Sequence, residues 1–155
     1  MALLPWRANF KAIMTAMHID LRTALSLAAI LQFGIAILNF GLNPIMGWKE
    51  ELQRMPLLIR EVHQVHAWFI SMTLFIFAIV TWRFVGDFAT GTNPITRWLA
   101  AGIGLFWALR VVLQVCYYSA SHWRGKAGRT AIHVSLLLIY GEFAWAYLLA
   151  AFRKG

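Results

Sequence analysis

The sequence predicts an all-α fold: a polytopic membrane protein in which an N-terminal amphipathic interfacial helix precedes a bundle of four transmembrane helices. Of its 155 residues, 61% are hydrophobic and only 13% are charged, and the mean hydropathy is +0.65. A soluble domain of this composition would have too few polar side chains to cover its surface. The apolar residues are also concentrated in four runs of about twenty residues, the length that an α-helix needs to cross a bilayer.

Residues 1–20 are predicted to form the interfacial helix. Polar and basic residues recur there at every third or fourth position, and apolar residues fill the other side, as in helices that lie in the plane of a membrane. The polar face comprises Arg7, Lys11, Thr15, His18 and Arg22. Pro5 suits the first turn of this helix, because the N–H that proline lacks would have no partner in that turn.

Residues 21–155 are predicted to form the transmembrane domain, with spans at about 21–40, 62–83, 95–118 and 130–152. The long connection between the first two spans mixes large apolar residues with charged ones, which indicates a short helix on the membrane surface. The segment from Gly86 to Pro94 is rich in glycine, threonine and asparagine and predicts a tight polar turn. Four spans place both ends of this domain on one side of the membrane.

The net charge of +8 does not indicate nucleic-acid binding, because the basic residues do not form a stripe. They stand singly at the ends of the apolar runs, where they can contact anionic lipid headgroups of the bilayer. Seven basic residues lie on the side of the termini and six on the opposite side, which favours cytoplasmic termini by one residue. The expected location is a bacterial inner membrane, with other membrane subunits or further copies of the chain as partners.

Polar residues inside the apolar runs mark the candidate site. Because neighbouring spans are antiparallel, the depth of each residue can be counted from the interface that the spans share. The layer near one interface contains His63, His66, Gln114 and His133, and a deeper layer contains Gln32, Arg110 and Glu142. Buried charges in a membrane are costly unless they face a partner or a cavity. We therefore expect an ion pair between Arg110 and Glu142; the alternative is that Glu142 faces a partner subunit.

Haem b is the first cofactor that this layer could bind. Two neutral imidazoles on separate helices at matching depth can ligate one iron, and His66 and His133 form the best pair, with His63 in reserve. Gln114 and Tyr117 share a helical face with Arg110 and could complete the shell around the ligands. The haem propionates would point toward a basic turn that contains Arg124, Lys126 and Arg129. In architecture the chain resembles the membrane cytochromes b, which implies an electron-transfer subunit that could exchange electrons with quinol.

Three alternatives remain open. The imidazoles of His63 and His66 share one helical face and could bind a non-haem metal together with His133 and His122. Histidine, glutamine, tyrosine and tryptophan near the interface could instead bond the ring oxygens of a quinone. Finally, the polar residues could serve a cofactor-free accessory or assembly subunit of a larger membrane complex. Whether the protein is an enzyme is not decided by these patterns. The single cysteine, Cys116, excludes an intramolecular disulfide.

Overall fold

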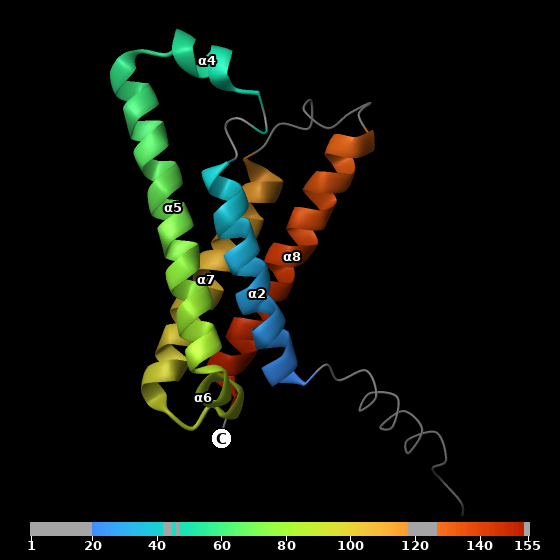
Figure 1. Cartoon of the computed structure of the whole chain (residues 1–155). Coiled ribbons are helices and arrows are strands. Elements are labelled where there is room, and N and C mark those ends of the chain that lie inside the picture. The colour runs from blue at the N-terminus through green and yellow to red at the C-terminus, as the bar shows by residue number, and fades with distance from the viewer. Residues whose placement is uncertain (1–19, 42–44, 46, 118–126, 154–155) are drawn as a thin grey trace, which may run out of the picture.

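The computed structural model describes residues 20–41, 45, 47–117 and 127–153, apart from the side chain at position 129, and is all-α in these parts. Its helices are α2 (Leu21–Phe40), α4 (Lys49–Arg54), α5 (Leu57–Arg83), α6 (Val85–Thr90), α7 (Pro94–Cys116) and α8 (Ala127–Phe152) (Figure 1). The predicted interfacial helix at residues 1–20 falls almost entirely outside the described residues. The short helix predicted in the first connection is present as α4.

Four of the described helices are long and apolar enough to cross a membrane, which confirms the prediction of an all-α protein with four candidate spans. They are Leu21–Phe40, Leu57–Arg83, Pro94–Cys116 and Thr130–Phe152. They run up, down, up and down, so the start of α2 and the end of α8 lie at the same end of the bundle (Figure 1). We call this the closed end, because α6 lies across it, and the opposite end, where α4 lies, the open end.

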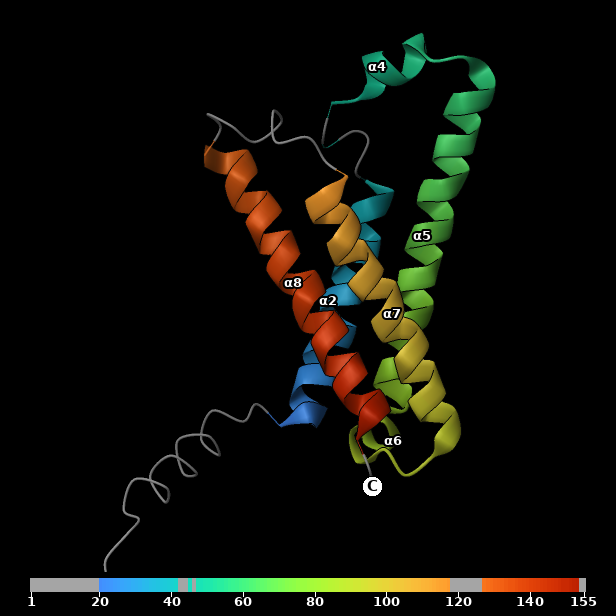
Figure 2. The same cartoon turned by 180° about the vertical axis from the view of Figure 1, so that it is seen from behind.

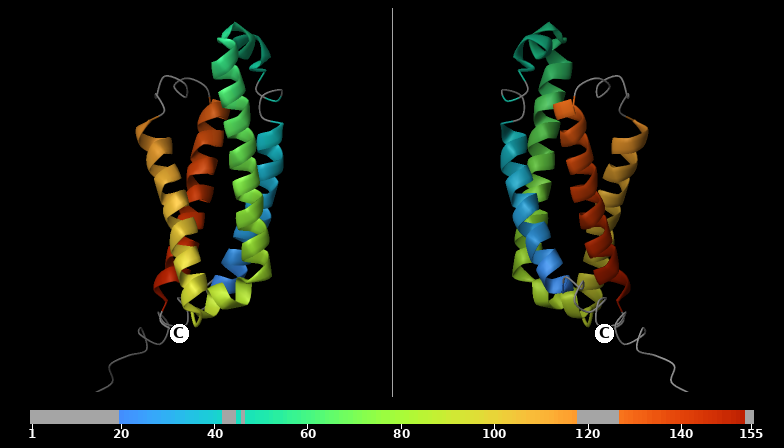
Figure 3. Two further views of the ribbon diagram at one scale, coloured as in Figure 1. Left: turned by 90° about the vertical axis from the view of Figure 1, so that its left-hand side faces the viewer. Right: turned by 90° about the vertical axis from the view of Figure 1, so that its right-hand side faces the viewer.

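The four spans form two helical pairs. In the first pair α2 packs along α5, and in the second α7 packs along α8, while contacts between the pairs are far fewer. The pairs meet at the closed end and separate toward the open end, where α5 and α8 lean apart (Figures 1 and 2). In the side views of Figure 3, α7 and α2 lie at opposite edges of the bundle toward the open end. The two pairs therefore form a V, and they are farthest apart at the open end.

The tight turn predicted from Gly86 to Pro94 is wrong in its first half. Residues Val85–Thr90 form the helix α6, which contacts all four spans and buries the ring of Phe88. Gly91 ends this helix with a φ of +66°, a conformation that favours glycine. A polar turn then follows, and Asn93 caps α7 by accepting a hydrogen bond from the N–H of Ile95 at 2.9 Å.

A second contact at the closed end ties the start of α7 to the end of α8. The Nε of Arg97 donates a hydrogen bond to the carbonyl of Ala151 at 3.0 Å. The last carbonyls of a helix have no partner within it, and a cation there also opposes the negative end of the helix dipole. Arg97 therefore holds the second pair together where the two pairs converge.

Gly104 lets α7 and α8 approach closely. A Cβ atom at this position would lie 2.9 Å from both Cγ and Cδ2 of Leu148 and 3.1 Å from its backbone nitrogen. Small residues at such crossings allow transmembrane helices to pack backbone to backbone. By contrast, a Cβ atom at Gly102, on the same helix, would have no atom within 4 Å.

We predict that Gly104→Ala lowers the stability of the protein by about 1–3 kcal/mol, because Leu148 and the α8 backbone must shift to admit the methyl group. Gly102→Ala is the matched control and should be neutral or slightly stabilising, since alanine is the better helix former. Thermal unfolding in detergent compares the two variants. Equal midpoints for both would contradict the close approach at Gly104.

Candidate functional site

One polar cluster, which we call the four-helix junction, joins all four spans between the closed end and the middle of the bundle. It consists of Gln32 on α2, Thr81 on α5, Trp107 on α7 and Tyr147 on α8. The Nε2 group of Gln32 donates to the Tyr147 hydroxyl at 2.7 Å and to the carbonyl of Ala28 at 3.1 Å. The Nε1–H of Trp107 donates to Oε1 of Gln32 at 3.2 Å, and the hydroxyls of Tyr147 and Thr81 bond to each other.

The junction leaves none of its buried polar atoms without a partner. All four side chains are at most 2% exposed, and both N–H bonds and the oxygen of the Gln32 amide are used. Because the Tyr147 hydroxyl already accepts a hydrogen bond from Gln32, its own O–H can donate a hydrogen bond to Thr81. In hydrocarbon, a donor or acceptor without a hydrogen-bond partner costs several kcal/mol. The full set of hydrogen bonds at the junction forms only when all four helices are in place.

Each helical pair also has a polar contact of its own nearer the open end. In the first pair, the side-chain nitrogen of Asn39 donates to the Ser71 hydroxyl at 3.1 Å. In the second pair, Nε2 of Gln114 lies 2.9 Å from Nδ1 of His133. These contacts join α2 to α5 and α7 to α8, and neither joins one pair to the other. The space between the pairs at the open end is therefore not closed by them.

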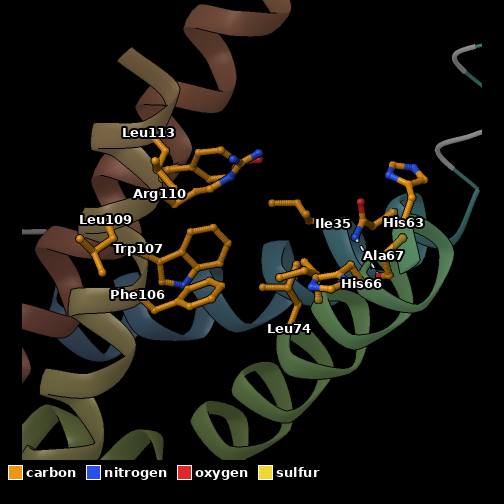
Figure 4. A pocket seen from close by; sticks show the side chains of 13 residues that line it. Ile35, His63, His66, Ala67, Leu74, Phe106, Trp107, Leu109, Arg110 and Leu113 are labelled. Carbon is orange, nitrogen blue, oxygen red and sulfur yellow. Dashed lines mark hydrogen bonds between the residues drawn. The ribbon is translucent and has the colours of Figure 1, made fainter. Parts of the chain in front are cut away.

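A cavity of about 530 Å³ occupies this space, within the range of roughly 300–1,000 Å³ that is usual for small-molecule and cofactor sites. All four spans contribute to its lining, which comprises Ile35, Asn39, His63, His66, Ala67, Ile70, Leu74, Phe106, Trp107, Leu109, Arg110, Leu113 and Tyr140. Figure 4 shows that the side chains of α5 and those of α7 approach it from opposite sides. Most of the lining is apolar, and its polar groups are few.

His66 supplies one of these polar groups from α5. Its Nδ1 lies 2.9 Å from the backbone carbonyl of Val62, one turn earlier in the same helix. A carbonyl oxygen can only accept, so Nδ1 carries the proton and Nε2 keeps its lone pair. His66 therefore offers the cavity an acceptor or a metal-ligating nitrogen, held in one tautomer by its own helix.

The opposite wall is aromatic and cationic. The rings of Trp107 and Tyr140 are stacked with centroids 5.1 Å apart and an interplanar angle of 27°. The guanidinium carbon of Arg110 lies 5.5 Å from the centroid of the Tyr140 ring, on the side of the cavity (Figure 4). Since Trp107 also donates to Gln32, the wall of the cavity is anchored directly in the four-helix junction.

The structure brings together only part of the predicted site. His63, His66 and Arg110 line the cavity. Gln114 and His133 bond to each other between α7 and α8 and do not line it. Tyr117 lies just beyond the end of α7 and is 80% exposed.

Trp107 and Tyr140, which form the aromatic wall of the cavity, were not among the predicted site residues. Trp107 stands three residues before Arg110 and therefore on the same face of α7, a signal that could have identified it. Tyr140 lies seven residues beyond His133 and shares a face of α8 with it. Its place in the cavity wall depends on how α8 packs against α7.

Other predicted contacts are placed or left open as follows. Tyr140 faces α7, and Glu142, two residues further along α8, points about 200° away from it. The ion pair of Arg110 with Glu142 stays a prediction that this geometry disfavours. Among the described residues no group of three or more histidine, cysteine, aspartate or glutamate side chains could hold a metal ion, so His63, His66 and His133 do not form one there. His122, Arg124 and Lys126 lie outside the described residues, as does the side chain of Arg129.

Comparison of the chain with protein-family models, with curated proteins and with solved structures finds no match. The assignment of a function therefore depends on the geometry of the cavity and its surroundings.

The junction predicts a difference between two identical substitutions on α5. Thr81→Val removes the hydroxyl that bonds Tyr147, whereas Thr73→Val removes a hydroxyl that bonds only the Phe69 carbonyl of its own helix, at 2.8 Å. Thr81→Val should lower the stability of the protein by about 1 kcal/mol, because the buried Tyr147 hydroxyl loses its bond to Thr81 and keeps only the one from Gln32. Thr73→Val should be close to neutral. Thermal unfolding in detergent measures both. A Thr73→Val protein that is the less stable of the two would contradict the role of the junction.

Proposed function

We propose that the protein is an electron-transfer subunit of the membrane that binds a quinone or quinol in the cavity between its two helical pairs. The observation that carries this proposal is a pair of polar groups on facing walls of a largely apolar cavity. His66 offers a lone pair from α5, and Arg110 offers N–H donors from α7. A quinone ring has an oxygen at each of its two opposite positions, so it can engage both walls at once.

The chemistry of each wall fits one part of this ligand. Nε2 of His66 can accept a hydrogen bond from a quinol hydroxyl and is a suitable site for its proton. Arg110 can donate to the other ring oxygen, and the stacked Trp107 and Tyr140 offer a flat surface beside the ring. Ile35 and Leu74 add apolar lining. An isoprenoid tail can leave between the separated pairs into the lipid.

Haem b is a second candidate, and one observation favours it. A histidine that ligates a metal usually donates its other ring N–H to a carbonyl or carboxylate, and His66 donates in this way to Val62. His66 could therefore serve as an axial ligand. His133, the second ligand expected from the sequence, is engaged with Gln114 and would have to leave it. A quinone needs no such rearrangement, which is why we place it first.

We predict that the purified protein releases a quinone on extraction with organic solvent, as identified by mass spectrometry. After delipidation it should bind decylubiquinone in equilibrium dialysis. His66→Leu and Arg110→Leu should each weaken this binding at least tenfold, because each removes one hydrogen bond worth about 1.4 kcal/mol or more in a dry site. His133→Gln is the control: it lies outside the cavity lining and should leave the affinity within twofold.

The optical spectrum distinguishes the candidates. If the reduced protein shows b-type haem bands that His66→Leu abolishes, haem replaces quinone as the ligand. A further loss in His133→Gln would then identify His133 as the second axial ligand. If the folded protein binds neither quinone nor haem, the proposal is wrong, and the cofactor-free accessory or assembly subunit takes its place. The thermal unfolding midpoint of each variant is measured first, and binding is compared only between variants with similar midpoints, so that a loss of binding does not reflect a loss of fold.

A further inference from the structure

Glu142 lies at the middle of a transmembrane span. The apolar span of α8 is Thr130–Phe152, so Glu142 stands twelve residues after its start and ten before its end. At 1.5 Å per residue, its Cα is about 18 Å and 15 Å from the two ends. The carboxylate cannot reach either membrane surface from this depth. It must be satisfied within the hydrocarbon layer.

The side chain is directed away from the core of this molecule. Tyr140, Phe143 and Tyr147 are the largest of the buried residues that pack α8 into the bundle. Glu142 is only half-buried and shares its outer stripe with Leu138 and Trp145, which are 69% and 54% exposed. Within the parts of the chain that the structure describes, no hydrogen bond or ion pair to Glu142 is found. A half-buried carboxylate therefore faces the bilayer from the outer side of α8.

A charge in this position is costly unless another molecule neutralises it. Asp and Glu residues within transmembrane helices almost always face a partner or a water-filled cavity, since insertion of such a charge costs several kcal/mol. The cavity of this protein is lined by Tyr140, on the opposite side of α8. The partner must therefore come from outside the bundle.

A second copy of this chain does not supply the required charge. A two-fold axis along the membrane normal would place Glu142 opposite Glu142, which brings two like charges to the same depth. Within the described spans, the arginine or lysine nearest the middle of a span is Arg110, six residues before the end of α7, and it lines the cavity on another side of the bundle. A symmetric dimer through this face would thus bury two carboxylates against each other.

We propose that the outer face of α8, defined by Leu138, Glu142 and Trp145, docks a transmembrane helix of a different protein that carries an arginine or lysine at mid-depth. The ion pair supplies charge neutralisation, and the exposed Leu138 and Trp145 supply apolar contact on either side of it. These residues are spaced by four and three positions, the spacing with which left-handed transmembrane helix pairs meet. The face and the cavity are separate, so this inference does not depend on the ligand of the cavity.

The test uses a synthetic transmembrane peptide of leucine and alanine with one central arginine, reconstituted with the full-length protein in phosphatidylcholine vesicles. A matched peptide carries leucine at the centre. A donor dye on Cys116, the single and exposed cysteine, and an acceptor dye on the peptide report their association by energy transfer. The arginine peptide should bind at least tenfold more tightly than the leucine peptide. Glu142→Gln, which keeps the shape and removes the charge, should reduce this difference to twofold or less.

Two controls can overturn the proposal. The first moves the charge to α7, in a Glu142→Gln, Leu105→Glu protein; Leu105 is 57% exposed and also lies at mid-span. If this protein binds the arginine peptide as tightly as the native chain, any lipid-facing carboxylate suffices and the α8 face is not a specific site. The second mixes donor- and acceptor-labelled copies without peptide. Self-association that Glu142→Gln abolishes would assign the face to a second copy and contradict a heteromeric partner. Equal binding of both peptides to the native chain would also refute the proposal.

Discussion

The arrangement of this protein depends on the hydrogen bonds of Gln32. A single amide at the centre of α2 receives the indole N–H of Trp107 and donates to Tyr147, which in turn bonds Thr81. In water such bonds would contribute little, because solvent could replace each partner. In hydrocarbon there is no replacement, so all four helices must be present for all of these groups to be satisfied. One polar side chain per helix thus specifies which faces of the four spans meet.

The position of this junction explains the shape of the molecule. Toward the closed end, α6, the Arg97 contact and the close approach at Gly104 hold the helices together. Toward the open end, the Asn39–Ser71 and Gln114–His133 contacts each lie within one pair, and a cavity lies between the pairs. Trp107 belongs to both regions, since its N–H bonds the junction while its ring lines the cavity. The orientation of the cavity wall is therefore set by the contacts that hold the bundle.

The four spans could be predicted from hydropathy because length and composition alone decide whether a helix can cross a bilayer. The helix α6 could not, since Gly86, Thr90 and Gly91 are typical of turns and the packing of Phe88 against the spans overrides that preference. Depth within the membrane was predicted by a count along each helix, and it stays a prediction because the count depends on where each span begins.

The direction in which each polar side chain points could not be predicted from the sequence. Gln32, Arg110 and Glu142 were predicted at one depth, yet they point into the junction, into the cavity and away from the bundle. His66 and His133 were also predicted at one depth, but they belong to different pairs of helices, nine and three residues from the starts of their spans. The rotation of a helix about its axis, and the choice of its neighbour, are decided by tertiary packing that one sequence does not reveal.

The central claim is that a quinone binds between the two helical pairs at the open end, and photoaffinity labelling tests it most directly. A photoreactive azidoquinone is irradiated with the protein in vesicles, and the modified residues are located by mass spectrometry. We expect label on the cavity-facing sides of α5 and α7, around His66 and Trp107, and its loss in the presence of excess unlabelled quinone. Label confined to lipid-facing residues such as Trp68, or label that excess quinone does not displace, would contradict the account.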